Sequence, residues 1–203
     1  MSRRAEFRLG TCTVPDGKKG PWTIDTFTIS EEEARFQNLR CLMGGSAFMR
    51  VNAGTYRRLR HKTRGVVMSN TPMEVMTNSE PFRLATGRVL INGLGLGMLL
   101  EAILSKPDVT YVRVIELEQD VIDLVGPHFA KDPRVEIICA DAYEYTPEKG
   151  ERFDYCWHDI WDTIGSDNLP LMAKLGRRYG KRRSNAQGFW ARDIIRADVR
   201  RWG

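Results

Sequence analysis

A turn rich in glycine is the first candidate for chemistry in this sequence. Gly93, Gly95 and Gly97 stand at alternate positions in GRVLINGLGLGMLLEAIL, residues 87–104, between an apolar run and a stretch with helical apolar spacing. Such a turn lets the main chain approach a ligand closely, with the N-terminus of the following helix directed at it. The stretch therefore predicts a strand, a ligand-binding turn and a helix. A tight turn without a ligand is the alternative.

Acidic residues follow the next three apolar runs. Glu116 is the second-last residue of YVRVIEL, Asp141 lies just after VEIIC, and Asp159 and Asp162 follow FDYCWH. The carboxyl ends of parallel strands meet at one edge of a sheet, where ligands bind. A carboxylate at Glu116 can accept both hydroxyls of a ribose. Asp141 can receive an adenine amino group while Ala142 offers its main-chain N–H.

The spacing of the glycines limits the kind of ligand. A dinucleotide-binding turn carries glycine at its first, third and sixth positions, and the sixth position counted from Gly93 is Met98. No lysine followed by serine or threonine comes after the turn, which excludes a triphosphate-binding P-loop. The spacing suits a turn that passes over an adenosyl group.

The elements that must position these residues alternate along the second half of the chain. Apolar runs predict strands at 88–93, 111–117, 135–141 and 153–160. Helices are expected between and after these strands, with a short helix or turn at 142–146. The helix at 118–129 is expected to be interrupted near Gly126-Pro127. Strands that are apolar almost throughout indicate a parallel sheet covered on both faces. The predicted helices are 97–106, 118–129 and 168–180.

The first part of the chain has a different pattern. Alternation predicts a strand at 22–30, and Ser30 with Glu33 forms a capping box that opens a helix through 31–43. Two short strands around Asn52-Ala53-Gly54, another strand at 65–69 and a helical stretch at 71–85 complete it. We expect a small mixed region over residues 1–85 and a ligand-binding domain with a basic tail over residues 86–203.

Composition excludes several classes of protein. The chain has 203 residues, 42% of them hydrophobic and 28% charged, which suffices for a sizeable core. No apolar run is long enough for a membrane helix, and no apolar stretch follows the basic N-terminus as in a signal peptide. The four cysteines are too far apart for a zinc motif, and no metal site is expected. We expect a cytoplasmic protein.

Residues 88–162 resemble the class I S-adenosylmethionine-dependent methyltransferases, and among them most the spermidine synthase-like branch. The resemblance is carried by VLINGLGLG, PDVTYVRVIELEQDVIDL, DPRVEIICADAYEY and FDYCWHDIWD. It implies a Rossmann-like doubly wound sheet and S-adenosylmethionine as cofactor. It also implies that Asp159 is the acid facing the reacting amine. The residues implied in cofactor binding are Gly93, Leu94, Gly95, Gly97, Glu116, Leu117, Asp141 and Ala142.

The sequence departs from the spermidine synthases at several positions. Leu96 stands where they carry an acid within the glycine turn, and Met68 stands where they carry a glutamine. Their amine-binding tyrosine and acids have no clear counterpart in SNTPMEVMTN. Only 41 residues follow Asp162, so the sheet is expected to be shortened at its C-terminus. His158 should point away from Asp159 along a strand and is interpreted as a packed histidine.

Three functions remain open from the sequence. The first is a methyltransferase acting on an unidentified amine or hydroxyl compound, and the second is an aminopropyltransferase. The third is a non-catalytic protein that binds the cofactor or nucleic acid. The net charge is +5, both ends of the chain are basic, and Arg192, Arg196 and Arg200 recur at four-residue spacing on an expected helix. Nucleic-acid binding through this tail is expected to be weak, and self-association stays open.

Overall fold

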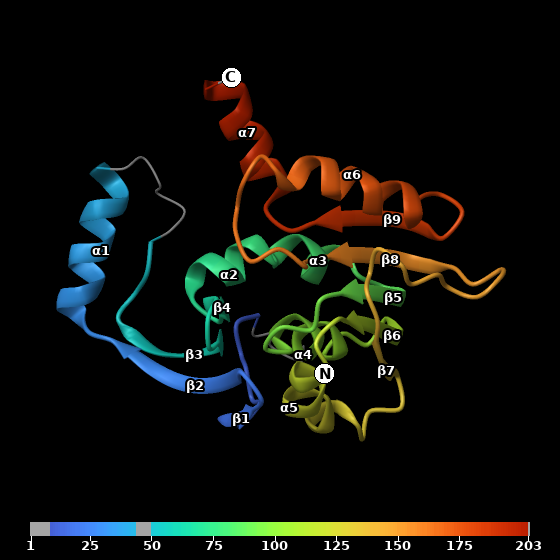
Figure 1. The fold of residues 1–203 in the computed structure, drawn as a ribbon, viewed down its shortest axis with the longest axis horizontal. Coiled ribbons are helices and arrows are strands. Elements are labelled where there is room, and N and C mark those ends of the chain that lie inside the picture. The colour runs from blue at the N-terminus through green and yellow to red at the C-terminus, as the bar shows by residue number, and fades with distance from the viewer. Residues whose placement is uncertain (1–8, 44–49, 203) are drawn as a thin grey trace, which may run out of the picture.

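The computed structural model describes residues 9–43 and 50–202, which form two sheets (Figure 1). The first sheet is antiparallel with the strand order β1-β2-β3-β4. Helix α1 follows β2, and the short helices α2 and α3 follow β4. The elements are β1 (Gly17–Lys19), β2 (Trp22–Ile29), α1 (Glu31–Met43), β3 (Gly54–His61), β4 (Gly65–Ser69), α2 (Pro72–Thr77) and α3 (Ser79–Leu84).

The second sheet is parallel and has the strand order β7-β6-β5-β8-β9. The order reverses between β5 and β8, so this sheet has the switch point of a doubly wound fold. The predicted Rossmann-like fold is confirmed. The elements are β5 (Gly87–Asn92), α4 (Met98–Leu104), β6 (Val109–Glu116), α5 (Gln119–Phe129), β7 (Val135–Cys139), β8 (Phe153–His158), α6 (Asn168–Arg178), β9 (Ser184–Phe189) and α7 (Arg192–Trp202).

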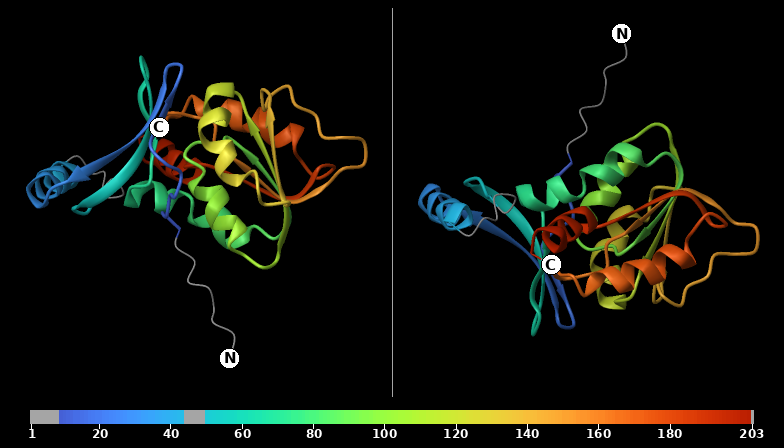
Figure 2. Two further views of the ribbon diagram at one scale, coloured as in Figure 1. Left: turned by 90° about the horizontal axis from the view of Figure 1, so that it is seen from below. Right: turned by 90° about the horizontal axis from the view of Figure 1, so that it is seen from above.

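Helices cover both faces of the parallel sheet (Figure 2). Val89 and Ile91 of β5 pack on one face in a cluster with α4 and α5, whereas Leu90 packs on the other face with α6. Successive side chains of a strand point to opposite faces, so a strand buried on both sides must be apolar throughout. This explains why the strands could be recognised as continuous apolar runs.

The structure corrects two expectations in the parallel sheet. Strand β9, Ser184–Phe189, was not identified from the sequence, and it gives the shortened sheet a fifth strand paired with β8. Helix α5 is not interrupted at Gly126-Pro127 but runs through Pro127 to Phe129. Proline lacks an N–H and usually breaks a helix interior. Here Val121, Val125 and Phe129 are buried on one side of α5, and this packing holds the helix together.

The first sheet also follows the prediction in most respects. The main-chain N–H of Ser30 donates to Glu33 at 2.7 Å, and that of Glu33 donates to the Ser30 hydroxyl at 3.2 Å, so the capping box is confirmed. The expected helical stretch at 71–85 forms two helices that meet at Asn78. The strand expected before Asn52 lies mostly outside the described residues. The division of the chain at residue 85 stays a prediction.

Candidate functional site

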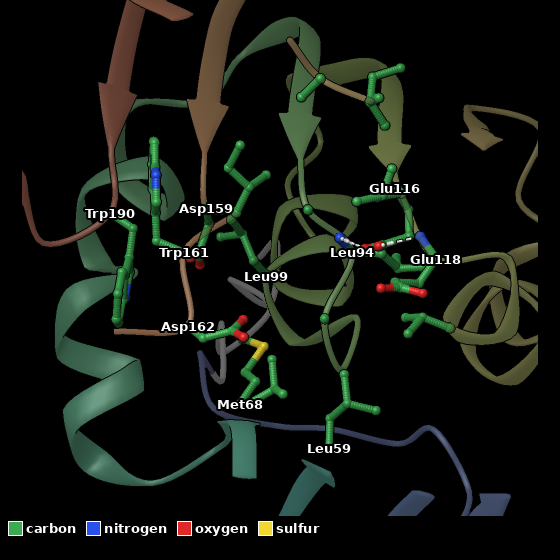
Figure 3. Close-up of a pocket in the computed structure, with 18 of the residues that line it drawn as sticks. Leu59, Met68, Leu94, Leu99, Glu116, Glu118, Asp159, Trp161, Asp162 and Trp190 are labelled. Atoms are coloured by element: carbon green, nitrogen blue, oxygen red, sulfur yellow. Dashed lines mark hydrogen bonds between the residues drawn. The ribbon is translucent and has the colours of Figure 1, made fainter. Parts of the chain in front are cut away.

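A pocket of about 330 Å³ lies at the carboxyl ends of β5, β6, β7 and β8. This volume is at the lower end of the range for small-molecule sites, about 300–1,000 Å³. The turn after β5 and the acids after the other strands line one wall, and the antiparallel sheet closes the opposite side (Figure 3). Of the predicted site residues, the lining includes Gly93, Leu94, Gly95, Glu116, Leu117, Asp141, Ala142 and Asp159.

Each glycine of the turn has positive φ, but each is needed for a different reason. The φ values of Gly93, Gly95 and Gly97 are 98°, 52° and 73°. A Cβ at Gly93 would lie 1.9 Å from the main-chain oxygen of Asp159, so this glycine allows the turn to touch the end of β8. A Cβ at Gly97 would lie 2.6 Å from the ring of Phe129, away from the pocket. Gly97 therefore caps the start of α4, and it is the one predicted cofactor-binding residue that does not line the pocket.

Gly95 faces the pocket, and the side chain of Met68 lies against it. A Cβ at Gly95 would lie 2.3 Å from the Met68 sulfur, and the main-chain N–H of Leu96 is 3.4 Å from the same sulfur. Met68 belongs to β4, so a side chain of the antiparallel sheet packs directly against the glycine turn. Leu96 itself is fully buried in the core.

Glu116 connects the turn to the end of β6. Its carboxylate accepts a hydrogen bond from the main-chain N–H of Leu94 at 2.8 Å and another from that of Glu118 at 3.0 Å. These bonds fix the carboxylate at the pocket wall (Figure 3). The next residue, Leu117, is 63% exposed although it is large and apolar. An apolar side chain beside an oriented carboxylate suits a ribose with an attached base.

Asp141 and Ala142 follow β7 at the same edge. The Asp141 carboxylate accepts a hydrogen bond from the main-chain N–H of Tyr143 at 2.7 Å, which forms a tight turn. The hydroxyl of Tyr179 donates to the main-chain oxygen of Ala142 at 2.8 Å and anchors the turn to α6. Both residues line the same pocket as Glu116.

Asp159 enters the pocket directly after β8. Burial raises the pKa of its carboxyl well above the usual value, and the nearby Glu74 carboxylate raises this pKa further. His158, the preceding residue, is fully buried on the other side of the strand. Its ring contacts the Asn92 amide at 2.7 Å and that of Gln187 at 3.2 Å, and burial lowers its pKa to about 3. The interpretation of His158 as a packed histidine agrees with this environment.

Six lining residues from the first part of the chain were not among the predicted site residues. They are Trp22, Leu59, Arg64, Val67, Met68 and Glu74. Their positions depend on how the antiparallel sheet and α2 pack over the parallel sheet, which no local pattern indicates. The guanidinium of Arg64 pairs with Glu118 at 3.3 Å and with Asp162 at 3.4 Å, and it lies 4.7 Å from the ring of Trp22. Arg64 thus joins the two sheets beside the pocket.

Two other features are absent from residues 9–43 and 50–202. No group of three or more histidine, cysteine, aspartate or glutamate side chains in these ranges is placed to hold a metal ion. None of the helices described there has the length and apolarity needed to cross a membrane.

The strand order, the glycine turn and the acids at the strand ends together form a Rossmann-like doubly wound sheet with a pocket at the carboxyl ends of its strands. No family model matches the sequence.

Solved structures of three enzymes are similar to parts of the chain. A dimethyladenosine transferase from Plasmodium falciparum shares 22% identity over 56% of this chain, with a TM-score of 0.42. Spermidine synthase from Thermotoga maritima shares 24% identity over 50%, with a TM-score of 0.37. M. capricolum TrmK, solved with S-adenosylhomocysteine, shares 12% identity over 54%, with a TM-score of 0.43. The matches span 40%, 42% and 48% of those chains, less than half of each.

Proposed function

We propose that the protein is a methyltransferase that uses S-adenosylmethionine and methylates an amine or hydroxyl compound. The observation that carries this proposal is the convergence of four strand ends, from β5 to β8, on one pocket. Each end contributes a feature suited to one part of an adenosyl amino acid. When bound, S-adenosylmethionine supplies a methyl group on a positively charged sulfur.

The residues fit this cofactor in charge and shape. The turn at Gly93–Gly95 would hold the methionine part through its main chain, Glu116 would accept the ribose hydroxyls, and Asp141 with Ala142 would hold the adenine base. The lining carries six carboxyl groups and one guanidinium, so it favours a cationic cofactor. Asp159 then orients the acceptor toward the methyl group and takes its proton, because orientation and proton removal are what such a transfer requires.

Aminopropyl transfer is the second enzymatic candidate, and one position counts against it. Leu96 occupies the place where spermidine synthases, by the resemblance, carry an acid in the turn, and its side chain is fully buried outside the pocket lining. A carboxylate cannot be supplied there without rebuilding the core. Methyl transfer is therefore the function that the site supports better.

Calorimetric titration with S-adenosylmethionine, its decarboxylated form and NAD tests this proposal. We expect S-adenosylmethionine to bind and NAD not to bind, since the turn lacks the third glycine of a dinucleotide site. Tighter binding of NAD would contradict the proposed cofactor. Tighter binding of the decarboxylated form would favour aminopropyl transfer over methyl transfer.

A further inference from the structure

The six carboxyl groups that line the pocket are not equivalent. Glu116 and Asp141 accept main-chain hydrogen bonds, and Glu118 and Asp162 pair with Arg64. Two carboxyl groups remain, and neither forms an ion pair with any residue in the described part of the chain. They are those of Glu74, on α2, and Asp159, after β8.

Glu74 is unusual because of its burial. Only 7% of the residue is exposed, and the main chain of Ser69 lies close to its carboxyl group. Burial raises the pKa of its carboxyl to about 7. An unpaired charge in such a place is costly, so buried acids are normally matched by a cation.

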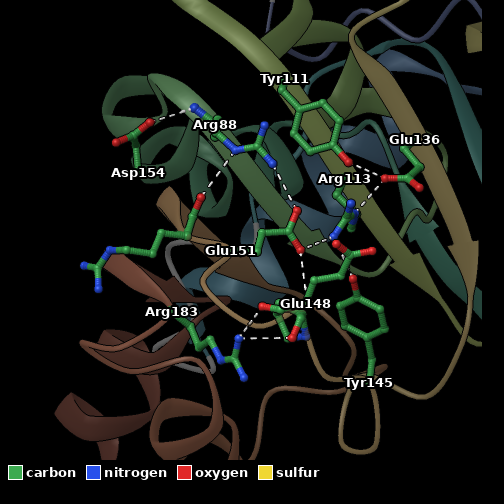
Figure 4. Close-up of polar contacts among 11 residues, drawn as sticks. Arg88, Tyr111, Arg113, Glu136, Tyr145, Glu148, Glu151, Asp154 and Arg183 are labelled. Atoms are coloured by element: carbon green, nitrogen blue, oxygen red, sulfur yellow. Dashed lines mark hydrogen bonds and ion pairs between the residues drawn. The ribbon is translucent and has the colours of Figure 1, made fainter.

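The opposite end of the parallel sheet shows such matching (Figure 4). The side chain of Glu151 is 12% exposed, and it accepts bonds from Arg88 at 3.0 Å and from Arg113 at 2.5 Å. Arg113 also pairs with Glu136 at 2.7 Å. Glu151 thus has two cationic partners at that end, whereas Glu74 and Asp159 face the pocket with no cationic partner among the described residues.

Two tryptophan rings line the pocket near Asp159. Trp161 and Trp190 lie with Asp159 on one side, whereas Leu94, Glu116 and Glu118 lie on the other (Figure 3). The indole N–H of Trp190 donates to the hydroxyl of Thr77 at 3.0 Å, which ties this ring to the helix that carries Glu74. Carboxylates beside aromatic faces are suited to an ammonium group.

We propose that Glu74 and Asp159 together form the binding site for the ammonium group of the acceptor, so that Glu74 is a second acceptor-binding acid and the acceptor is an amine that arrives as a cation. This inference rests on the proposed function and deepens it. One carboxylate takes a proton from R–NH₃⁺ and gives R–NH₂ and a carboxylic acid. The nitrogen lone pair then forms the N–CH₃ bond while the S–CH₃ bond breaks and its electron pair stays on sulfur. The product is R–NH₂–CH₃⁺, which the other carboxylate stabilises.

NMR titration with n-pentylamine and 1-pentanol at pH 8, in the presence of saturating S-adenosylhomocysteine, tests the inference. We expect pentylammonium to bind about tenfold more tightly than pentanol, since only the cation can pair with the two carboxylates. Glu74→Gln should weaken pentylammonium binding about tenfold and leave S-adenosylhomocysteine binding within about twofold. Asp162→Asn is the matched control, because Asp162 is a pocket acid that already has a cationic partner, and we expect it to retain binding.

The inference would be overturned if Glu74→Gln bound the amine as tightly as the wild type does. It would also be overturned if the wild type bound amine and alcohol equally, and in either case the proposed function would stand. Absence of S-adenosylhomocysteine binding by the wild type would instead contradict the proposed function. If Glu74→Gln does not fold, Asp159→Asn must show the same selective loss of the amine.

Discussion

The carboxylate of Glu116 accepts a hydrogen bond from the main-chain N–H of Leu94, 22 residues earlier in the chain, at 2.8 Å. The acid at the end of β6 is therefore part of the structure of the glycine turn after β5. Glu116 orients the turn, and in the proposed function it also binds the ribose of the cofactor. Substitutions at Glu116 must be interpreted with both in mind.

Replacing Glu116 with alanine should weaken binding of S-adenosylhomocysteine at least about tenfold, because each lost charge-assisted hydrogen bond costs about 1.5–3 kcal/mol. Calorimetry measures the affinity, and circular dichroism checks that the fold persists. Glu118→Ala is the control, since Glu118 pairs with Arg64 at a half-exposed position. Unchanged affinity in Glu116→Ala would remove Glu116 from the binding site.

Gly95→Ala should destabilise the protein, in part through a clash with Met68 that a second substitution at Met68 would relieve. The new Cβ would lie 2.3 Å from the Met68 sulfur, and a positive φ costs an alanine about 1–2 kcal/mol in addition. Met68→Ala in the same chain removes the contact but not the backbone cost. Urea unfolding of the two single variants and the double variant should therefore show coupling. Strictly additive losses would mean that Met68 does not lie on Gly95 in solution.

Glu74 should make stability depend on pH. Its pKa is about 7 in the folded protein and near 4.5 when exposed, so between these values the folded chain holds a proton that the unfolded chain has lost. Stability must then fall as pH rises from about 4.5 to about 7, by roughly 3 kcal/mol in total for a shift of this size.

Urea unfolding at pH 5 and pH 8 measures this effect. Glu74→Gln should lose less stability between the two pH values than the wild type does. Asp159 contributes in the same direction, so only the difference between variant and wild type belongs to Glu74. Glu32→Gln, on the exposed side of α1, should behave like the wild type. An identical pH dependence of Glu74→Gln and the wild type would show that Glu74 is not buried.

The basic tail needs a different test from a simple truncation. A chain that ends at Gly180 would lose β9 and Trp190, which belong to the sheet and the pocket. Arg178 and Arg183 are also engaged, since they donate to main-chain oxygens of the loop at 144–148. Arg196 and Arg200 on α7 are exposed and are the better targets.

We expect weak binding of duplex DNA or RNA at low salt, and weaker binding still by the Arg196→Gln, Arg200→Gln double variant. If both arginines meet phosphates on DNA, the slope of log K against log salt should fall in magnitude by about 1.8. Fluorescence anisotropy at several salt concentrations gives both values. Equal slopes would place these arginines on a surface that meets only solvent.

Much of the parallel sheet could be predicted because β5, β6 and β8 are buried on both faces and so are continuous apolar runs. Strand β9 could not, since SNAQGF offers little apolar signal, and its extended form depends on pairing with β8. Its clearest apolar residue, Phe189, stands at the end of the strand, and the buried Trp190 follows it.

The site was predictable to a similar degree. Glu116, Asp141 and Asp159 were found because parallel strand ends must share an edge. Glu74 was missed because a glutamate in a short helical stretch normally faces solvent. Its burial arises when α2 packs against the parallel sheet, and such long-range packing leaves no mark in the local sequence.

The reversal of strand order between β5 and β8 also bears on how the molecule folds. Strands β5, β6 and β7 pair with their neighbours in sequence, whereas β8 must return to β5 across about 60 residues of intervening chain. Closing that long loop lowers the chain entropy before the contacts between β5 and β8 form and offset this cost. We expect β8 and β9 to join late, after a nucleus of β5, α4 and β6 has formed. Since the cavity opens at this seam, ligand affinity would arise only with the final step of folding.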